Sequence, residues 1–230
     1  GSVSMVLLLP EIAVLSASGS AEDSFPKTLE WYFSVIAELG RAAAVTTSYT
    51  GNDHWPNLYA GAFTLVLVWL YVLNRRISWK EKVPRMLMLA FFLVSFADNQ
   101  LDNIWHGMHF PQALPGRQSF LYIFMLLVMG FATIRKWKGT RRWHIIIAVL
   151  AALTLMVLSG YYGDELVTEY MAVVITMLFI LVYGILLLLL KIAPKKMRIA
   201  LREAAFCVAI AELAVNMAVT GLGVTSRVAY

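Results

Sequence analysis

One short polar segment of this chain holds residue types whose spacing could support chemistry. Asp98 and Asp102 lie four positions apart, and paired carboxylates can transfer protons because neighbouring like charges raise one pKa. His106 and His109 lie three positions apart, which would place both imidazoles on one helix face, where they could bind a divalent metal. Arg117 follows, and its planar guanidinium can bind two phosphate oxygens at once.

Structural roles for the same residues stay open. The two aspartates could solvate the end of a helix, and the two histidines could hydrogen-bond within a loop and fix its shape. Arg117 could pair with either aspartate instead of a phosphate. No HExxH motif and no clear third ligand accompany the histidines, so we expect no cofactor, with a divalent metal as the alternative. The residues predicted to contact a substrate are Asp98, Asp102, Asn103, Trp105, His106, His109 and Arg117.

The elements that must position these side chains are membrane helices. The chain is 60% hydrophobic and only 14% charged, whereas soluble domains are about 25% charged. A span needs about 20 apolar residues, and the run before the polar segment is short, which favours a helix that breaks there. The apolar runs are about 57–74, 86–97, 118–134, 144–160, 170–190 and 204–222, with a seventh, 3–17, that looks cut short. The predicted fold is an all-α polytopic bundle of about seven spans, in one transmembrane domain over 1–230 that is a central fragment of a longer protein.

The basic residues predict the orientation of the bundle. Three connections, 75–85, 135–142 and 191–202, hold 15 of the 19 Lys and Arg residues. Connections rich in Lys and Arg face the cytoplasm, so the segments between them face outward. This clustering also argues that the net charge of +5 does not serve nucleic acid, and the single cysteine excludes a disulfide framework.

Two outer segments are predicted to hold structure of their own. Segment 98–117 contains prolines, glycines and mixed apolar and polar side chains, and a polar segment at membrane depth must be buried in protein or line a wet cavity. We therefore expect it to re-enter the bundle. Segment 18–56 is an outer loop, and apolar residues at helical spacing through 29–40 predict an interfacial helix with Trp31 and Tyr32 near the headgroups.

Three polar residues lie within apolar runs, namely Glu11, Glu212 and Asn216. Lipid would not tolerate them, so they should face the bundle interior or a cavity. A helix-to-helix hydrogen bond and a role in transport both stay open for them.

A motif in the polar segment resembles one family, the bacterial membrane proteins of the YfhO family. The motif reads Ile104-Trp105-His106-Gly107-Met108-His109-Phe110-Pro111, followed by Leu114-Pro115-Gly116-Arg117 and Ser119-Phe120. The resemblance extends weakly over most of the chain, to Gly223-Val224-Thr225-Ser226-Arg227. The chain departs from the family at Asp98 and Asp102, where the family usually has Asn-rich sequence.

The resemblance implies a GT-C-type glycosyltransferase of the bacterial cytoplasmic membrane. Such an enzyme transfers a sugar from a polyprenyl-phosphate donor to a cell-surface polymer, such as a teichoic acid, on the outer face. Its catalytic acid usually lies in the first outer loop, which we expect outside this fragment, so no catalytic residue is assigned. The expected partners are membrane lipid, the lipid-linked sugar and the polymer acceptor. A lipid-linked sugar flippase or transporter and a non-catalytic scaffold subunit are the alternatives.

Overall fold

The described part of the chain is helical. The computed structural model describes residues 5–6, 9–10, 13–14, 25–46, 55–108, 116–163 and 170–223. Within these ranges there is no strand, and the one extended pairing is an isolated bridge between Trp31 and Asp98. The predicted all-α class is confirmed.

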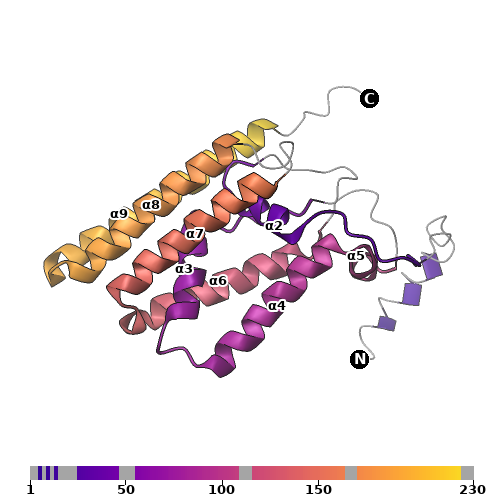
Figure 1. The fold of residues 1–230 in the computed structure, drawn as a ribbon, viewed down its shortest axis with the longest axis horizontal. Helices are drawn as coiled ribbons and strands as arrows, with labels where there is room; N and C mark the ends of the chain where they lie inside the picture. The colour runs from indigo at the N-terminus through magenta and orange to yellow at the C-terminus, as the bar shows by residue number, and fades with distance from the viewer. Residues whose placement is uncertain are drawn as a thin grey trace.

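Six long helices build the bundle (Figure 1). They are α3 (Ala62–Leu73), α4 (Trp79–Ala97), α6 (Ser119–Arg135), α7 (Arg142–Tyr162), α8 (Tyr170–Ile192) and α9 (Lys195–Gly223). Short elements join them, namely α2 (Val35–Glu38), the 3₁₀ turn η2 (Leu39–Ala42), α5 (Asn99–Trp105) and the 3₁₀ turn η3 (Trp137–Gly139).

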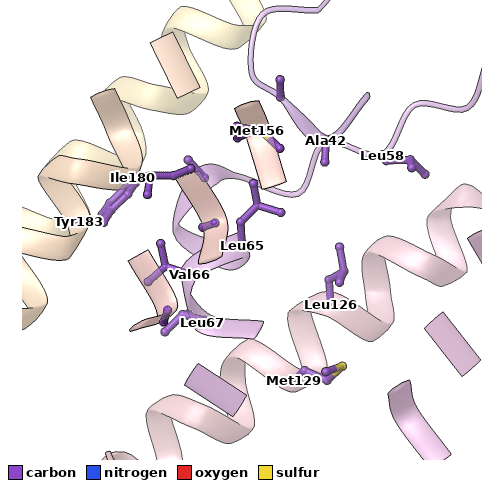
Figure 2. Packing of buried hydrophobic residues seen from close by; sticks show 14 of the residues in the cluster. Ala42, Leu58, Leu65, Val66, Leu67, Leu126, Met129, Met156, Ile180 and Tyr183 are labelled. Carbon is purple, nitrogen blue, oxygen red and sulfur yellow. The ribbon is translucent and has the colours of Figure 1, made fainter. Parts of the chain in front are cut away.

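Helix α3 is the centre of the core, because it packs against α6, α7 and α8. Figure 2 shows its Val66 side chain between the neighbouring helices, with Ile180 of α8 and Met129 of α6 nearby. Helices α7 and α8 approach closely at Gly184, where an added Cβ would lie 2.7 Å from a methyl group of Val149. Small residues at such crossings let membrane helices pack tightly.

Three helices of the described part are long and apolar enough to cross a membrane. These are α7, α8 and most of α9, over Lys195–Gly221. Helices α3 and α6 are apolar but have only 12 and 17 residues. The short run predicted at 86–97 is part of a longer helix, because α4 already begins at Trp79 and continues past Pro84. Its predicted break before the polar segment is present, since α4 ends at Ala97 and α5 begins at Asn99.

The three basic connections meet at one end of the bundle, which we call the basic end. The Lys136 ammonium lies 3.0 Å from a Glu81 carboxylate oxygen, and Asn74 donates its amide to the Lys136 carbonyl at 3.0 Å. Lys191 donates to the Trp137 carbonyl at 3.2 Å. Helices α2 and α5 lie at the opposite end, toward the right of Figure 1, which we call the polar end.

The outer segment differs from its prediction. Residues 25–34 are not helical, and the first helix there, α2, begins at Val35 after Ser34, whose hydroxyl accepts from the Ala37 N–H at 3.1 Å. Elements α2 and η2 are packed inside the bundle against α7 and α4, with Glu38 and Arg41 buried. The helix predicted over 29–40 therefore begins six residues later, at Val35, and its place at a membrane interface stays a prediction.

Candidate functional site

The polar end is organised by the break between α4 and α5. Asp98 has an extended backbone that ends α4, and its carboxylate caps α5 by accepting from the Leu101 N–H at 2.7 Å. A side-chain oxygen at this position satisfies a backbone donor that the helix leaves free. Asp98 is buried, and its carboxylate is engaged in this cap. Its main role is therefore to redirect the chain from α4 into α5, which carries the candidate site.

An extended strap, residues 25–34, holds this break in place. The Tyr32 N–H donates to the Ala97 carbonyl at 2.9 Å, and the Asn99 N–H donates to the Glu30 carbonyl at 3.1 Å. The Asn99 side chain completes the pairing, because it accepts from the Glu30 N–H and donates to the Thr28 carbonyl, both at 3.0 Å. The strap thus fixes where α5 begins.

Asp102 and His106 form a buried pair one turn apart on α5. The His106 Nδ1 atom lies 3.2 Å from an Asp102 carboxylate oxygen and 2.8 Å from the Asp102 carbonyl, and both side chains are at most 3% exposed. Hydrogen bonding to the Asp102 carboxylate raises the pKa of His106, although burial opposes this. The second ring nitrogen, Nε2, is also buried and has no hydrogen-bond partner within the described ranges.

Arg117 lies just before α6 and is exposed. The pKa of His106 is raised mainly by its hydrogen bond to Asp102, and the positive charge of Arg117 opposes this only weakly. Gly116 beside it has a φ of 61°, and an added Cβ would clash with Pro56 at 2.8 Å, which pins this turn against the outer loop. No ion pair joins Arg117 to Asp98 or Asp102 in the part of the chain that is described.

The other residues predicted to contact a substrate are Asn103, Trp105 and His109, and the two that the structure describes lie in different environments. Asn103 is buried on α5, and its side-chain oxygen has no partner in the described structure. Trp105 is 39% exposed and packs its ring 5.9 Å from that of Phe92. His109 lies outside the described residues, as do 110–115, so re-entry of segment 98–117 stays a prediction.

An aromatic pocket of about 380 Å³ opens beside the strap. Tyr32, Phe33, Trp55 and Tyr162 line it, and the rings of Phe33 and Trp55 stack at 4.1 Å between centroids. Aromatic faces with a few polar neighbours are suited to a ring-shaped ligand with apolar faces and a polar edge.

Glu38 is a candidate that sequence reasoning missed. Its side chain is fully buried, and neither carboxyl oxygen has a hydrogen-bond partner among the described residues. Burial raises its pKa to about 9, so the group carries a proton at neutral pH. Ala37, which precedes it, lines the aromatic pocket. The burial of this segment was indicated by the run after it, Gly40-Arg41-Ala42-Ala43-Ala44, in which every residue except Arg41 is small. Such small residues are typical of closely packed helices and not of an exposed helix.

Arg41 attaches the outer loop at Pro56 and Asn57 to the interior of the bundle. It is buried, and it donates to the Pro56 carbonyl at 3.2 Å and to the Asn57 side-chain oxygen at 2.8 Å. These bonds attach the turn around Pro56 to η2, and Gly116 packs on the same proline. Arg41 thus connects the aromatic pocket to the start of α6.

The deeper polar residues of α9 lie inside the bundle. Glu212 is 2% exposed and accepts from the Tyr59 hydroxyl at 2.8 Å, the Tyr183 hydroxyl at 2.7 Å and the Ala62 N–H at 2.6 Å. The Asn216 side-chain oxygen accepts from the Val45 N–H at 2.7 Å. These bonds tie α9 to the start of α3 and to the segment after η2. Glu11 lies outside the described residues.

The described residues contain no group of three or more His, Cys, Asp or Glu side chains that could hold a metal ion. The described polar end offers a different set of groups: an exposed arginine, a buried Asp–His pair and a buried acid without a hydrogen-bond partner.

Comparison with known proteins assigns the family. A search of curated proteins and a search of solved structures each returned no match. The family model described as "Bacterial membrane protein YfhO" matches residues 1–230, the whole chain. The chain therefore belongs to the YfhO family of bacterial membrane proteins.

Proposed function

We propose that this chain is part of a membrane glycosyltransferase that transfers a sugar from a polyprenyl-phosphate donor to a cell-surface polymer. One observation carries the proposal: the exposed Arg117 lies at a helix start that no side chain caps. A guanidinium and free backbone N–H groups both favour an anion, so this part of the polar end is suited to a phosphate. We place this end on the outer face of the bacterial cytoplasmic membrane, in a bundle of about seven spans.

The geometry around Arg117 supports phosphate binding. The residue lies at the start of α6, where no side chain caps the first turn, and backbone N–H groups at a helix start favour anions. The guanidinium is exposed and keeps its charge at any relevant pH. His106 adds a second donor through Nε2 when its ring is protonated, and the hydrogen bond from Nδ1 to Asp102 favours that form.

The aromatic pocket is our candidate for the sugar. Its volume of about 380 Å³ lies in the range of about 300–1,000 Å³ for small-ligand pockets. Rings such as Trp55 and Tyr162 can pack on the apolar face of a pyranose, while hydroxyl groups of Tyr32 and Ser34 are available to its polar edge.

In the proposed reaction, an acceptor hydroxyl oxygen bonds to the anomeric carbon of the sugar and gives its proton to a general base that is assigned to no residue of this chain. The bond from the anomeric carbon to the phosphate oxygen breaks. The electron pair stays on the phosphate, where Arg117 and protonated His106 stabilise the added charge. Glu212 gives no support to the transport alternative, because three donors already engage its carboxyl group.

The test is transfer of radiolabelled sugar from a polyprenyl-phosphate donor by the full-length protein in liposomes. We expect Arg117→Ala to weaken donor binding by roughly ten- to a hundredfold, since a charge-assisted hydrogen bond contributes about 1.5–3 kcal/mol. Arg117→Lys should restore part of the loss, because it keeps the charge but not the planar donor pair. Arg142→Ala is the matched control, since Arg142 is equally exposed but lies at the basic end. Normal donor binding by Arg117→Ala would overturn the phosphate role.

A further inference from the structure

A large apolar groove lies far from the polar end, near the basic end of the bundle. It has a volume of about 570 Å³. Its walls come from four helices, with Phe63 and Leu67 of α3, Ile134 of α6, Leu187 of α8 and Phe206 of α9. Ile134 and Phe206 are themselves exposed, so the groove opens sideways to whatever surrounds the bundle.

One charged residue, Arg202, lines this groove. Its position along α9 gives its distance from the basic end. Arg202 is seven positions into α9, which places its backbone roughly 10 Å along the helix from the basic end. The side chain is exposed, and the structure gives it no ion pair among the described residues. A guanidinium beside apolar walls needs an anion or water at its head, and a long side chain extends toward the nearer interface to reach one.

The rim of the groove carries a second cation. Trp137 lines the groove, and the Lys191 ammonium lies 4.7 Å from the centroid of its ring. Lys191 also donates to the Trp137 carbonyl at 3.2 Å, so its position is fixed. The groove thus joins an apolar channel to two positive charges, and an indole ring at such a boundary is typical of a membrane interface.

We propose that this groove binds one acyl chain of an anionic glycerophospholipid, with the lipid phosphate held by Arg202 and Lys191. The apolar walls match the chain, and the charge at the rim matches the headgroup. The basic connections around the rim strengthen the attraction of anionic lipid to this end. A peptide would leave most of its backbone N–H and C=O groups without partners, because only Arg202 and Trp137 among the lining residues have polar side-chain atoms.

The test compares phosphatidylglycerol with phosphatidylcholine as ligands of the purified full-length protein in detergent, by native mass spectrometry and by thermal shift. These lipids have the same acyl chains but differ in net charge. We expect phosphatidylglycerol to bind more tightly, and Arg202→Gln to weaken its binding by roughly fivefold, since one basic residue near an anionic headgroup contributes about 1 kcal/mol. Arg202→Gln should leave phosphatidylcholine binding unchanged. Arg142→Gln, at the same end but outside the groove, is the matched control and should change neither.

A second variant tests the channel and not the charge. Ala209 lines the groove, and Ala209→Phe would fill part of it, which should lower the binding of both lipids. The proposal is overturned if wild-type protein binds the two lipids equally, or if Arg202→Gln keeps the full preference for phosphatidylglycerol. It is also overturned if polyprenyl phosphate displaces phosphatidylglycerol at a much lower concentration, because the groove would then serve the donor lipid.

Discussion

Two buried glutamates of this protein have opposite surroundings. Glu212 on α9 accepts three hydrogen bonds, from two tyrosine hydroxyls and one backbone N–H. Glu38 in α2 is equally buried, yet its carboxyl group has no partner among the described residues. A buried polar group without a partner costs free energy, so a position that keeps one calls for an explanation beyond packing.

The difference separates a structural acid from a candidate functional one. Glu212 joins three segments distant in the sequence and thereby holds α9, whose outward face is exposed along most of its length. Glu38 contributes no such link and carries a proton at neutral pH because burial raises its pKa to about 9. It also follows Ala37, which lines the aromatic pocket, although Glu38 itself does not line it.

The largest expected change in the free energy of unfolding follows from removing the Glu212 side chain. Glu212→Ala leaves the hydroxyls of Tyr59 and Tyr183 and the N–H of Ala62 buried without their acceptor. We expect the free energy of unfolding to fall by about 3–5 kcal/mol, as measured by denaturant unfolding in detergent micelles. Glu203→Ala is the control on the same helix, since Glu203 is exposed, and it should change stability by less than about 0.5 kcal/mol. Equal effects of the two variants would remove the distinction between the glutamates.

The next effect is a dependence of the protein's stability on pH that arises from Glu38. Because its folded-state pKa is about 9 and the unfolded value is near 4.5, the folded state binds one proton more than the unfolded state between these values. Stability from this group is therefore full below pH 4.5 and falls as the pH rises toward 9, by at most about 1.4 kcal/mol per pH unit.

Comparing wild type with Glu38→Gln isolates this dependence. The amide is uncharged and similar in shape, so we expect the variant to match wild type at pH 5 and to exceed it at pH 8, by up to about 4 kcal/mol. Thermal melts across this range measure the difference. If the two proteins keep parallel stability from pH 5 to pH 8, Glu38 is not held neutral by burial.

The smallest expected change in stability comes from the second hydrogen bond that attaches α9, between Asn216 and Val45. Asn216 accepts from the N–H of Val45, which has the unusual backbone φ of 57° for a β-branched residue. Asn216→Ala leaves that buried donor unsatisfied, so we expect a loss of about 1–2 kcal/mol. Asn216→Asp keeps the acceptor and should lose less. Hydrogen exchange at the Val45 amide is the direct measurement, and unchanged protection in Asn216→Ala would show that the bond does not form in solution.

Periodicity and charge predicted most of the architecture. Apolar length predicted the helices α6, α7 and α8 close to their observed bounds, because span-length runs have few alternative structures in lipid. Helix α9 begins at Lys195, nine residues before the predicted run 204–222, because its first turns are charged. The clustering of Lys and Arg predicted which connections meet, and the bonds among Asn74, Lys136 and Lys191 show that they do. Helix α4 was placed too short, because its charged first turns lower its apolar content.

The polar end was less predictable for a physical reason. Local spacing singled out Asp98, Asp102 and His106, because each lies four positions, about one helix turn, from the next. Glu38 was missed because its burial depends on α2 packing between α4 and α7, which no local pattern reports. The strap was predicted as helix for the same reason, since its bonds go to residues about 70 positions away.

The bond between Glu212 and Ala62 also sets an order of assembly. Helix α3 starts at Gly61 without a side-chain cap of its own, and its first N–H finds an acceptor 150 positions later in the chain. At ribosomal speeds of about 5–20 residues per second, that acceptor is synthesised roughly 8–30 s after α3. During this interval the centre of the bundle has an open end that water, lipid headgroups or the insertion machinery must cover. Closure of this helix start therefore waits for α9, and a nascent chain that stalls before α9 leaves the Ala62 N–H without this acceptor.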